Sequence, residues 1–245
     1  MGMLPFIIFA IVILAVIIGI YASYRYEKKR TEQLTELAES LGLVFLPQGD
    51  DQLDSIRRNF QLFNQGHSRK VSNVLCGETD EVKLAIFDYT FTVGSGKNSS
   101  THRQTISTIQ SPDFNIPEFT MRPEGFLDSI GGMLGFQDID FDNHPEFSNA
   151  FVLKSSQEDR VRQFFNKPVL DYFAKHSGIS VEARPGHLIF FRNNRRVKPD
   201  DMKQMLADTY EVYGLFADRL AQEQSQNANV QQNLMDDVRE QYPRD

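Results

Sequence analysis

The feature that most constrains this chain is an uncharged run of 19 residues near its N-terminus, from Leu4 to Ala22. A helix of that length spans about 28 Å, close to the roughly 30 Å hydrocarbon core of a bilayer. Nine of the 19 residues are Ile or Val, which disfavour a helix in water, but in lipid a lone segment must be helical to satisfy its backbone hydrogen bonds. The run therefore predicts a transmembrane anchor, which includes Leu4, Phe6, Ile13, Ile20 and Ala22.

A cleaved signal peptide and a buried core helix are the two alternatives for this run. A signal peptide has a basic beginning and an apolar stretch of only about 7–15 residues. Residues 1–3 carry no charged side chain, and the run is longer than that. A core helix of a soluble protein has a polar face, which 19 apolar residues do not leave. We therefore favour the anchor.

The charges that follow the run predict its orientation. Arg25, Lys28, Lys29 and Arg30 stand directly after it, opposed only by Glu27. Basic residues beside a membrane span stay on the cytoplasmic side, and these four are the predicted topogenic residues. We expect a single-pass protein of the cell membrane, with its N-terminus outside and its soluble part in the cytoplasm. The lipid bilayer is its first predicted partner.

Charge and cysteine content narrow the function classes. Residues 31–245 carry a net charge of −10, which repels phosphate backbones, so nucleic acid is not an expected partner. Cys76 is the single cysteine, which leaves no intrachain disulfide and no thiolate zinc site.

The segment Gly94 to Lys97 departs from a phosphate-binding loop at both flanking positions and is predicted to be a hairpin loop. No cofactor is expected.

Hydrophobic periodicity predicts an α+β fold. The anchor continues as a helix to Gly42, and residues 31–142 form a first α+β subdomain with an antiparallel meander. Further helices are expected over 54–63 and 125–134. Residues 143–220 form a second subdomain with the order helix, strand, strand, helix. Residues 221–245 include nine Gln or Asn and are predicted to be a disordered tail.

Two sets of residues are candidates for chemistry. Asp88 and His102 lie on neighbouring predicted strands beside the Gly94 loop, and with Arg103 they could supply a general acid and base. The alternative is a cross-strand surface contact.

The second set is Asp138, Asp140 and Asp142, which alternate as the first three ligands of a calcium loop do. The pattern lacks the bidentate Glu, since Asn149 stands in its place, and the intervening apolar residues favour a strand with its acids on one face. We therefore predict no metal site and keep the three aspartates as alternative ligands.

Several short motifs together resemble a known family. They are Phe87-Asp88-Tyr89, Gly94 to Lys97 followed by Thr101 to Thr105, Arg122 to Gly125, and Gln137 to Phe141. In this order they resemble a family of uncharacterised bacterial proteins with one amino-terminal transmembrane helix and a soluble α+β domain. The resemblance runs from the anchor to about Leu220. It implies the architecture and a bacterial source, and it implies no catalytic residues.

The leading hypothesis is a non-enzymatic, membrane-tethered cytoplasmic module that binds an unknown protein partner or senses a condition at the membrane. The alternative is a membrane-anchored hydrolase that uses Asp88, His102 and Arg103. A deep pocket lined by these residues and the Asp138 cluster would favour the enzyme, whereas a flat apolar patch would favour the module.

Overall fold

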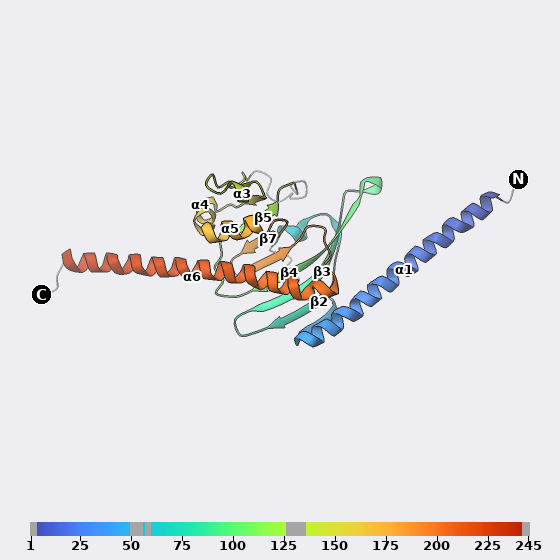
Figure 1. Ribbon diagram of the computed structural model, residues 1–245, viewed down its shortest axis with the longest axis horizontal. Coiled ribbons are helices and arrows are strands. Elements are labelled where there is room, and N and C mark those ends of the chain that lie inside the picture. The colour runs from blue at the N-terminus through green and yellow to red at the C-terminus, as the bar shows by residue number, and fades with distance from the viewer. Residues whose placement is uncertain (1–3, 50–55, 57–59, 126–135, 242–245) are drawn as a thin grey trace.

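The computed structural model describes residues 4–49, 56, 60–125 and 136–241. It contains one antiparallel sheet with a long helix at each end of the chain, α1 (Leu4–Leu41) and α6 (Met202–Gln241). The two helices project from the sheet in opposite directions (Figure 1). The predicted α+β class, with an apolar N-terminal helix ahead of a meander, is confirmed.

The sheet has eight strands in the order β1-β2-β3-β4-β8-β7-β5-β6, and every pairing is antiparallel. The strands are β1 (Val44–Gln48), β2 (His67–Glu78), β3 (Lys83–Val93), β4 (Ser100–Gln110), β5 (Phe119–Pro123), β6 (Phe151–Lys154), β7 (Ser180–Arg184) and β8 (His187–Phe191). Strands β2, β3 and β4 form the meander predicted from Val71 onward, with β1 added at its edge. The fourth strand expected in that meander, β5, pairs instead with β6 and β7. Because β4 pairs with β8, a single sheet continues across the subdomain boundary predicted at residue 142.

Short helices join the strands of the second half. They are α3 (Pro145–Ser148), α4 (Glu158–Phe164) and α5 (Lys167–Lys175), with 3₁₀ turns at η1 (Gln61–Asn64), η2 (Gly96–Asn98) and η5 (Pro199–Asp201). The order α5, β7, β8, α6 is the predicted helix, strand, strand, helix. The helix expected over 125–134 lies outside the described residues, as does most of the one expected over 54–63, whose end forms η1.

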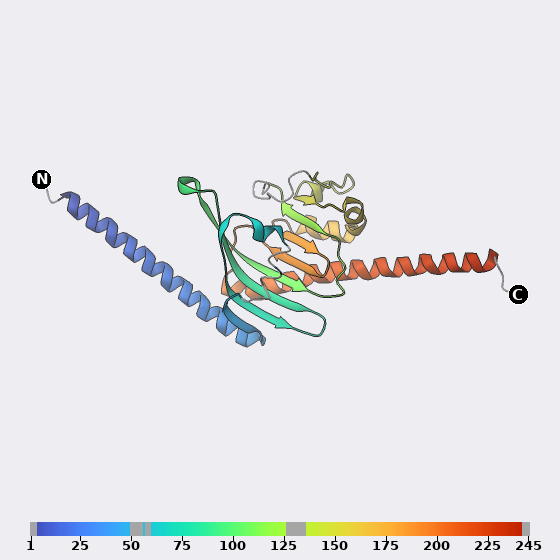
Figure 2. The ribbon, with the colours of Figure 1, turned by 180° about the vertical axis from the view of Figure 1, so that it is seen from behind.

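Side chains alternate between two buried faces of the sheet, as they do along any strand. The helix face packs against α4, α5, α6 and the second half of α1, with Phe165, Phe173 and Phe216 in its core. The loop face packs under the segment 60–66, where Phe63 contacts the rings of Phe87 and Tyr89. Figure 2 shows that segment, in teal, across the sheet from α6.

Helix α1 has two different halves. Its apolar half contacts no other element: Phe6 is 74% exposed, Ile13 and Ile20 are exposed too, and no residue of the apolar window is buried. Leu34 and Ala38 in its second half are fully buried in the core. The buried-core alternative for residues 4–22 is therefore wrong. Among the described residues, α1 is the one helix that is both long enough and apolar enough to cross a membrane.

Helix α6 corrects the expectation of a disordered tail. It continues to Gln241, well beyond the sheet (Figure 1). Neither Gly nor Pro occurs from residue 215 to 242, and Gln is a good helix former, so low hydrophobicity alone does not end the helix.

Candidate functional site

The most highly charged part of the interior is centred on Asp88, in the middle of β3 on the helix face. Asp88 is 3% exposed, and both of its carboxylate oxygens accept hydrogen bonds. Arg30 donates through Nε and Nη2, each at 2.8 Å, and Asn73, Thr105 and Arg196 donate at 3.0 Å. A buried carboxylate needs such donors to offset the loss of its hydration.

The residues that donate to Asp88 come from four segments of the chain: α1, β2, β4 and the loop after β8. Arg30 lies on α1, one turn beyond Glu27, and Arg196 follows β8. Arg196 donates to Asp88 and also, through both Nη atoms, to the carboxylate of Glu27 at 2.6 Å. These bonds fasten the helix that leaves the membrane run to the centre of the sheet.

Arg30 therefore differs from the other predicted topogenic residues. Arg25, Lys28 and Lys29 are exposed, as expected of residues beside a headgroup layer. Arg30 is 3% exposed and paired with Asp88, because α1 turns this face onto the helix face of the sheet. Sequence reasoning missed this contact because the two residues lie 58 positions apart.

A β-bulge in β2 completes the site. The register of β2 against β3 shifts between Ser72 and Leu75, and Asn73 has φ of 53° within this bulge. Asn adopts this left-handed conformation more readily than most residues. Its side chain donates to Asp88 and accepts a hydrogen bond from Thr31 at 2.9 Å, so it links α1 to β3 a second time.

The network predicts a loss of stability in acid. Burial alone would raise the pKa of Asp88, but the bonds and charges of Arg30 and Arg196 hold it below its ordinary value of 3.8. The hydrogen bond from Arg196 likewise lowers the pKa of Glu27. A lowered folded-state pKa contributes stability above the unfolded-state pKa, and that contribution is lost as the pH falls below about 3.8. Unfolding midpoints of the detergent-solubilised protein should fall over this range, and less steeply in an Asp88→Asn variant; equal slopes in the two proteins would contradict this origin.

The structure separates Asp88 from its predicted catalytic partner. Asp88 pairs with Thr105 across the strands, whereas His102 pairs with Phe91 and stacks on its ring at 5.0 Å. Because positions 102 and 105 differ by three, their side chains lie on opposite faces of the sheet. Arg103 is exposed on the helix face. The three residues form no acid and base pair.

The three predicted metal-binding aspartates are all exposed. Asp138 also accepts a hydrogen bond from the backbone N–H of Leu153 at 2.8 Å. Ile139 between Asp138 and Asp140 is buried, in line with the expected alternation. Within the described ranges, no group of three or more His, Cys, Asp or Glu is arranged to hold a metal ion.

A second buried ion pair lies on the loop face. Glu182 on β7 is fully buried and accepts hydrogen bonds from Arg122 and from the backbone N–H groups of Gln61 at 2.8 Å and Leu62 at 3.0 Å. The guanidinium of Arg122 lies 4.6 Å from the centre of the Phe191 ring. The Glu182 carboxylate therefore holds the segment 60–66 against the sheet. Sequence reasoning missed this ion pair, because Glu182 alternates with the apolar Val181 and Ala183 and so takes the place of an outward polar residue in the strand.

A hollow of about 540 Å³ opens on the loop face beside the edge strand β1. Its apolar lining includes Val44, which is 60% exposed, together with Leu46, Val74 and Ala85. None of the predicted catalytic or metal-binding residues lines it. The hollow is therefore not the pocket expected of the predicted hydrolase, and because it is concave it is not the flat apolar patch expected of the module either.

Comparison with known proteins bears on the fold. No protein-family model and no curated protein matches the chain. Among solved structures, it is similar to the crystal structure of the mycobacterial trehalose monomycolate transport factor A, TtfA, with a TM-score of 0.53 at 10% sequence identity. The match covers 78% of this chain and 94% of that one. The two chains share a fold. At this identity the likeness extends to the fold alone.

Proposed function

We propose that the protein is a non-enzymatic single-pass membrane protein whose α+β module binds a partner protein, or senses a condition, at the membrane. The observation that carries the proposal is the network at Asp88. It joins the helix leaving the apolar run to the middle of the sheet, so the module is held in a fixed orientation relative to the anchor.

The hydrogen bonding of the buried charges supports a binding role rather than hydrolysis. Both oxygens of Asp88 are occupied by donors, and its pKa is held below the ordinary value, so it is a poor general base near neutral pH. The apolar hollow beside β1 offers a partner an exposed surface instead. The fold shared with TtfA, which is described as a transport factor, fits an accessory role of this kind.

The proposed location is a bacterial cell membrane, with the N-terminus outside and the module in the cytoplasm. The exposed cations Arg25, Lys28 and Lys29 support this orientation. A reporter that is active only outside the cytoplasm, fused after Asp245, should stay inactive, and strong activity would overturn the orientation.

Crosslinking in native membranes tests the partner proposal. We expect a photoreactive residue at Val44, beside the hollow, to form adducts with a defined protein, because this apolar side chain is exposed. The same residue at Lys175, an exposed position at the end of α5 on the helix face, is the matched control. Mass spectrometry of the adducts identifies the partner. Equal, background-level adducts at the two positions would count against the proposal.

A further inference from the structure

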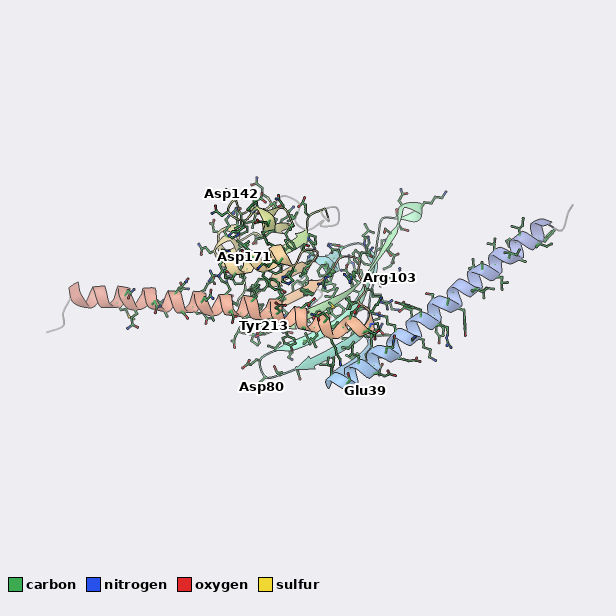
Figure 3. All side chains as sticks on the ribbon, in the orientation of Figure 1. Glu39, Asp80, Arg103, Asp142, Asp171 and Tyr213 are labelled. Atoms are coloured by element: carbon green, nitrogen blue, oxygen red, sulfur yellow. The ribbon has the colours of Figure 1, made fainter. Side chains whose placement is uncertain are left out.

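The hairpin of β3 and β4 extends toward the membrane end of α1. In Figure 1 its tip, in green, projects from the sheet on the side toward which the apolar half of α1 runs. Figure 3 shows Arg103 on this side, between the hairpin and α1, and Asp80 at the opposite end of the sheet. Since the Asp88 network ties α1 to the sheet, this relation between hairpin and anchor is built into the fold.

Elementary geometry indicates how far the hairpin reaches. Arg30 and Asp88 are in contact, so both helix and strand can be measured from the same point. From Arg30 back to Ala22 the helix rises about 12 Å at 1.5 Å per residue. From Asp88 to Gly94 at the tip, the strand extends about 20 Å at 3.4 Å per residue. A hairpin that runs alongside α1 is therefore long enough to reach the level of Ala22, where the apolar run ends.

Three segments at this end of the module carry only positive charge, while Asp201 and Asp208 lie beside the loop after β8. Residues 64–73, 89–105 and 192–198 contain eight Lys or Arg and no Asp or Glu, although residues 31–245 have a net charge of −10. The three segments adjoin one another: His67 at the start of β2 contacts the carbonyl of Gly94 at 3.0 Å, and Asn194 contacts the backbone of Arg103 at 3.1 Å.

Several of these cations have no counter-charge from the protein. Arg192 pairs with Asp208, and Arg196 pairs with Glu27 and Asp88. Lys97, Arg103 and Arg195 are exposed, and within the described part of the chain none of them forms an ion pair with a carboxylate. A basic surface on an acidic domain, held at headgroup level, matches the negative potential of a membrane rich in anionic lipid.

We infer that this basic end, made of the β3–β4 hairpin tip and the loop after β8, binds anionic lipid headgroups next to the anchor. This surface gives the module a second contact with the membrane, so that the module lies against the bilayer surface instead of being attached through α1 alone. The inference rests on the proposed function only in requiring that α1 spans the bilayer.

The test uses the full chain in vesicles, with an environment-sensitive fluorophore on Ser95→Cys at the tip and with Cys76→Ser to avoid labelling there. Vesicles of phosphatidylcholine are compared with vesicles that also contain phosphatidylglycerol, each with a nitroxide-labelled lipid as quencher. We expect stronger quenching at position 95 with phosphatidylglycerol than with phosphatidylcholine alone, and we expect 0.5 M NaCl to remove the difference by screening. The same label on Asp80→Cys should stay unquenched.

Charge removal tests the named cations. In the triple variant Lys97→Gln, Arg103→Gln and Arg195→Gln, the ratio of bound to free tip should fall by about two orders of magnitude at low salt. The matched control, Lys154→Gln, Lys167→Gln and Lys175→Gln, removes three cations from the second half of the chain and should bind as the parent does.

Three outcomes would overturn the inference. The first is quenching at position 95 that does not exceed quenching at position 80, and the second is equal quenching in the two kinds of vesicle. The third is a fluorophore at position 95 that is shielded from water in native membranes but not in vesicles, which would indicate a protein partner instead. Extraction with alkaline carbonate separates these outcomes from failure of the anchor. A chain that resists extraction but lacks tip contact refutes this inference alone, whereas an extracted chain refutes the proposed function.

Discussion

Replacing Asp88 with Asn is expected to lower the free energy of unfolding by about 3–5 kcal/mol, the usual cost of removing one partner of a buried ion pair. The amide is neutral and has one acceptor oxygen, so Arg30 keeps its charge at 3% exposure without a counter-ion. In a chain of this size the midpoint of thermal unfolding should fall by roughly 6–20 °C. Denaturant and thermal melts of the full chain in detergent measure the change.

Two further variants separate the ion pair from a general effect of mutation. Asp80→Asn removes an exposed carboxylate and should change stability by less than about 0.5 kcal/mol. The double variant Arg30→Met with Asp88→Leu removes the pair together and should recover part of the loss, because the unpaired cation is gone while Asn73, Thr105 and Arg196 still lack their acceptor. If Asp88→Asn melts within 1 °C of the parent, or if the double variant loses the sum of its parts, the network is not coupled as described.

The order and type of the main elements were predictable because they follow from local pattern. In β3 the alternation of Ile86 and Phe87 puts one residue on each buried face, and the strand is recognisable without knowledge of its neighbours. Gly42, with φ of 68°, ends α1 in the left-handed turn that its position predicted. The pairing of β4 with β8 was not predictable, since nothing in either strand indicates its partner across 77 or more residues.

The candidate site shows the same limit more sharply. Asp88 was singled out from the sequence, but with His102 as its partner, because the two flank one loop. Asp88 pairs with Thr105, and His102 lies three residues before Thr105, so the side chains of Asp88 and His102 are on opposite faces of the sheet. The charged partners of Asp88 come from α1 and from the loop after β8. Arg30 had a sufficient local explanation as a topogenic charge, so nothing in the sequence called for a second role. When a local rule already explains a charged residue, as it does for Arg30, sequence reasoning does not look for a tertiary contact of that residue.

The second large effect is expected at Glu182. Replacement by Gln removes the counter-charge of the buried Arg122 and leaves one acceptor oxygen for the backbone N–H groups of Gln61 and Leu62. We expect a loss of about 3–5 kcal/mol in the free energy of unfolding, measured by denaturant melts. Hydrogen exchange at residues 60–65 should rise more than exchange in β7 itself, because Glu182 clips this segment to the loop face.

The control is Glu118→Gln, at a partly exposed carboxylate 3.3 Å from Arg184, where we expect a change below about 1 kcal/mol. Adding Arg122→Met to Glu182→Gln should restore part of the stability, since the unpaired cation is then gone while one acceptor remains for the segment. Exchange at residues 60–65 should recover less than global stability does, because the second backbone N–H still lacks its acceptor. Full recovery of both would mean that the charge alone matters and that Glu182 does not hold the segment; recovery of neither would mean that Arg122 contributes through its packing on Phe191 rather than through its charge.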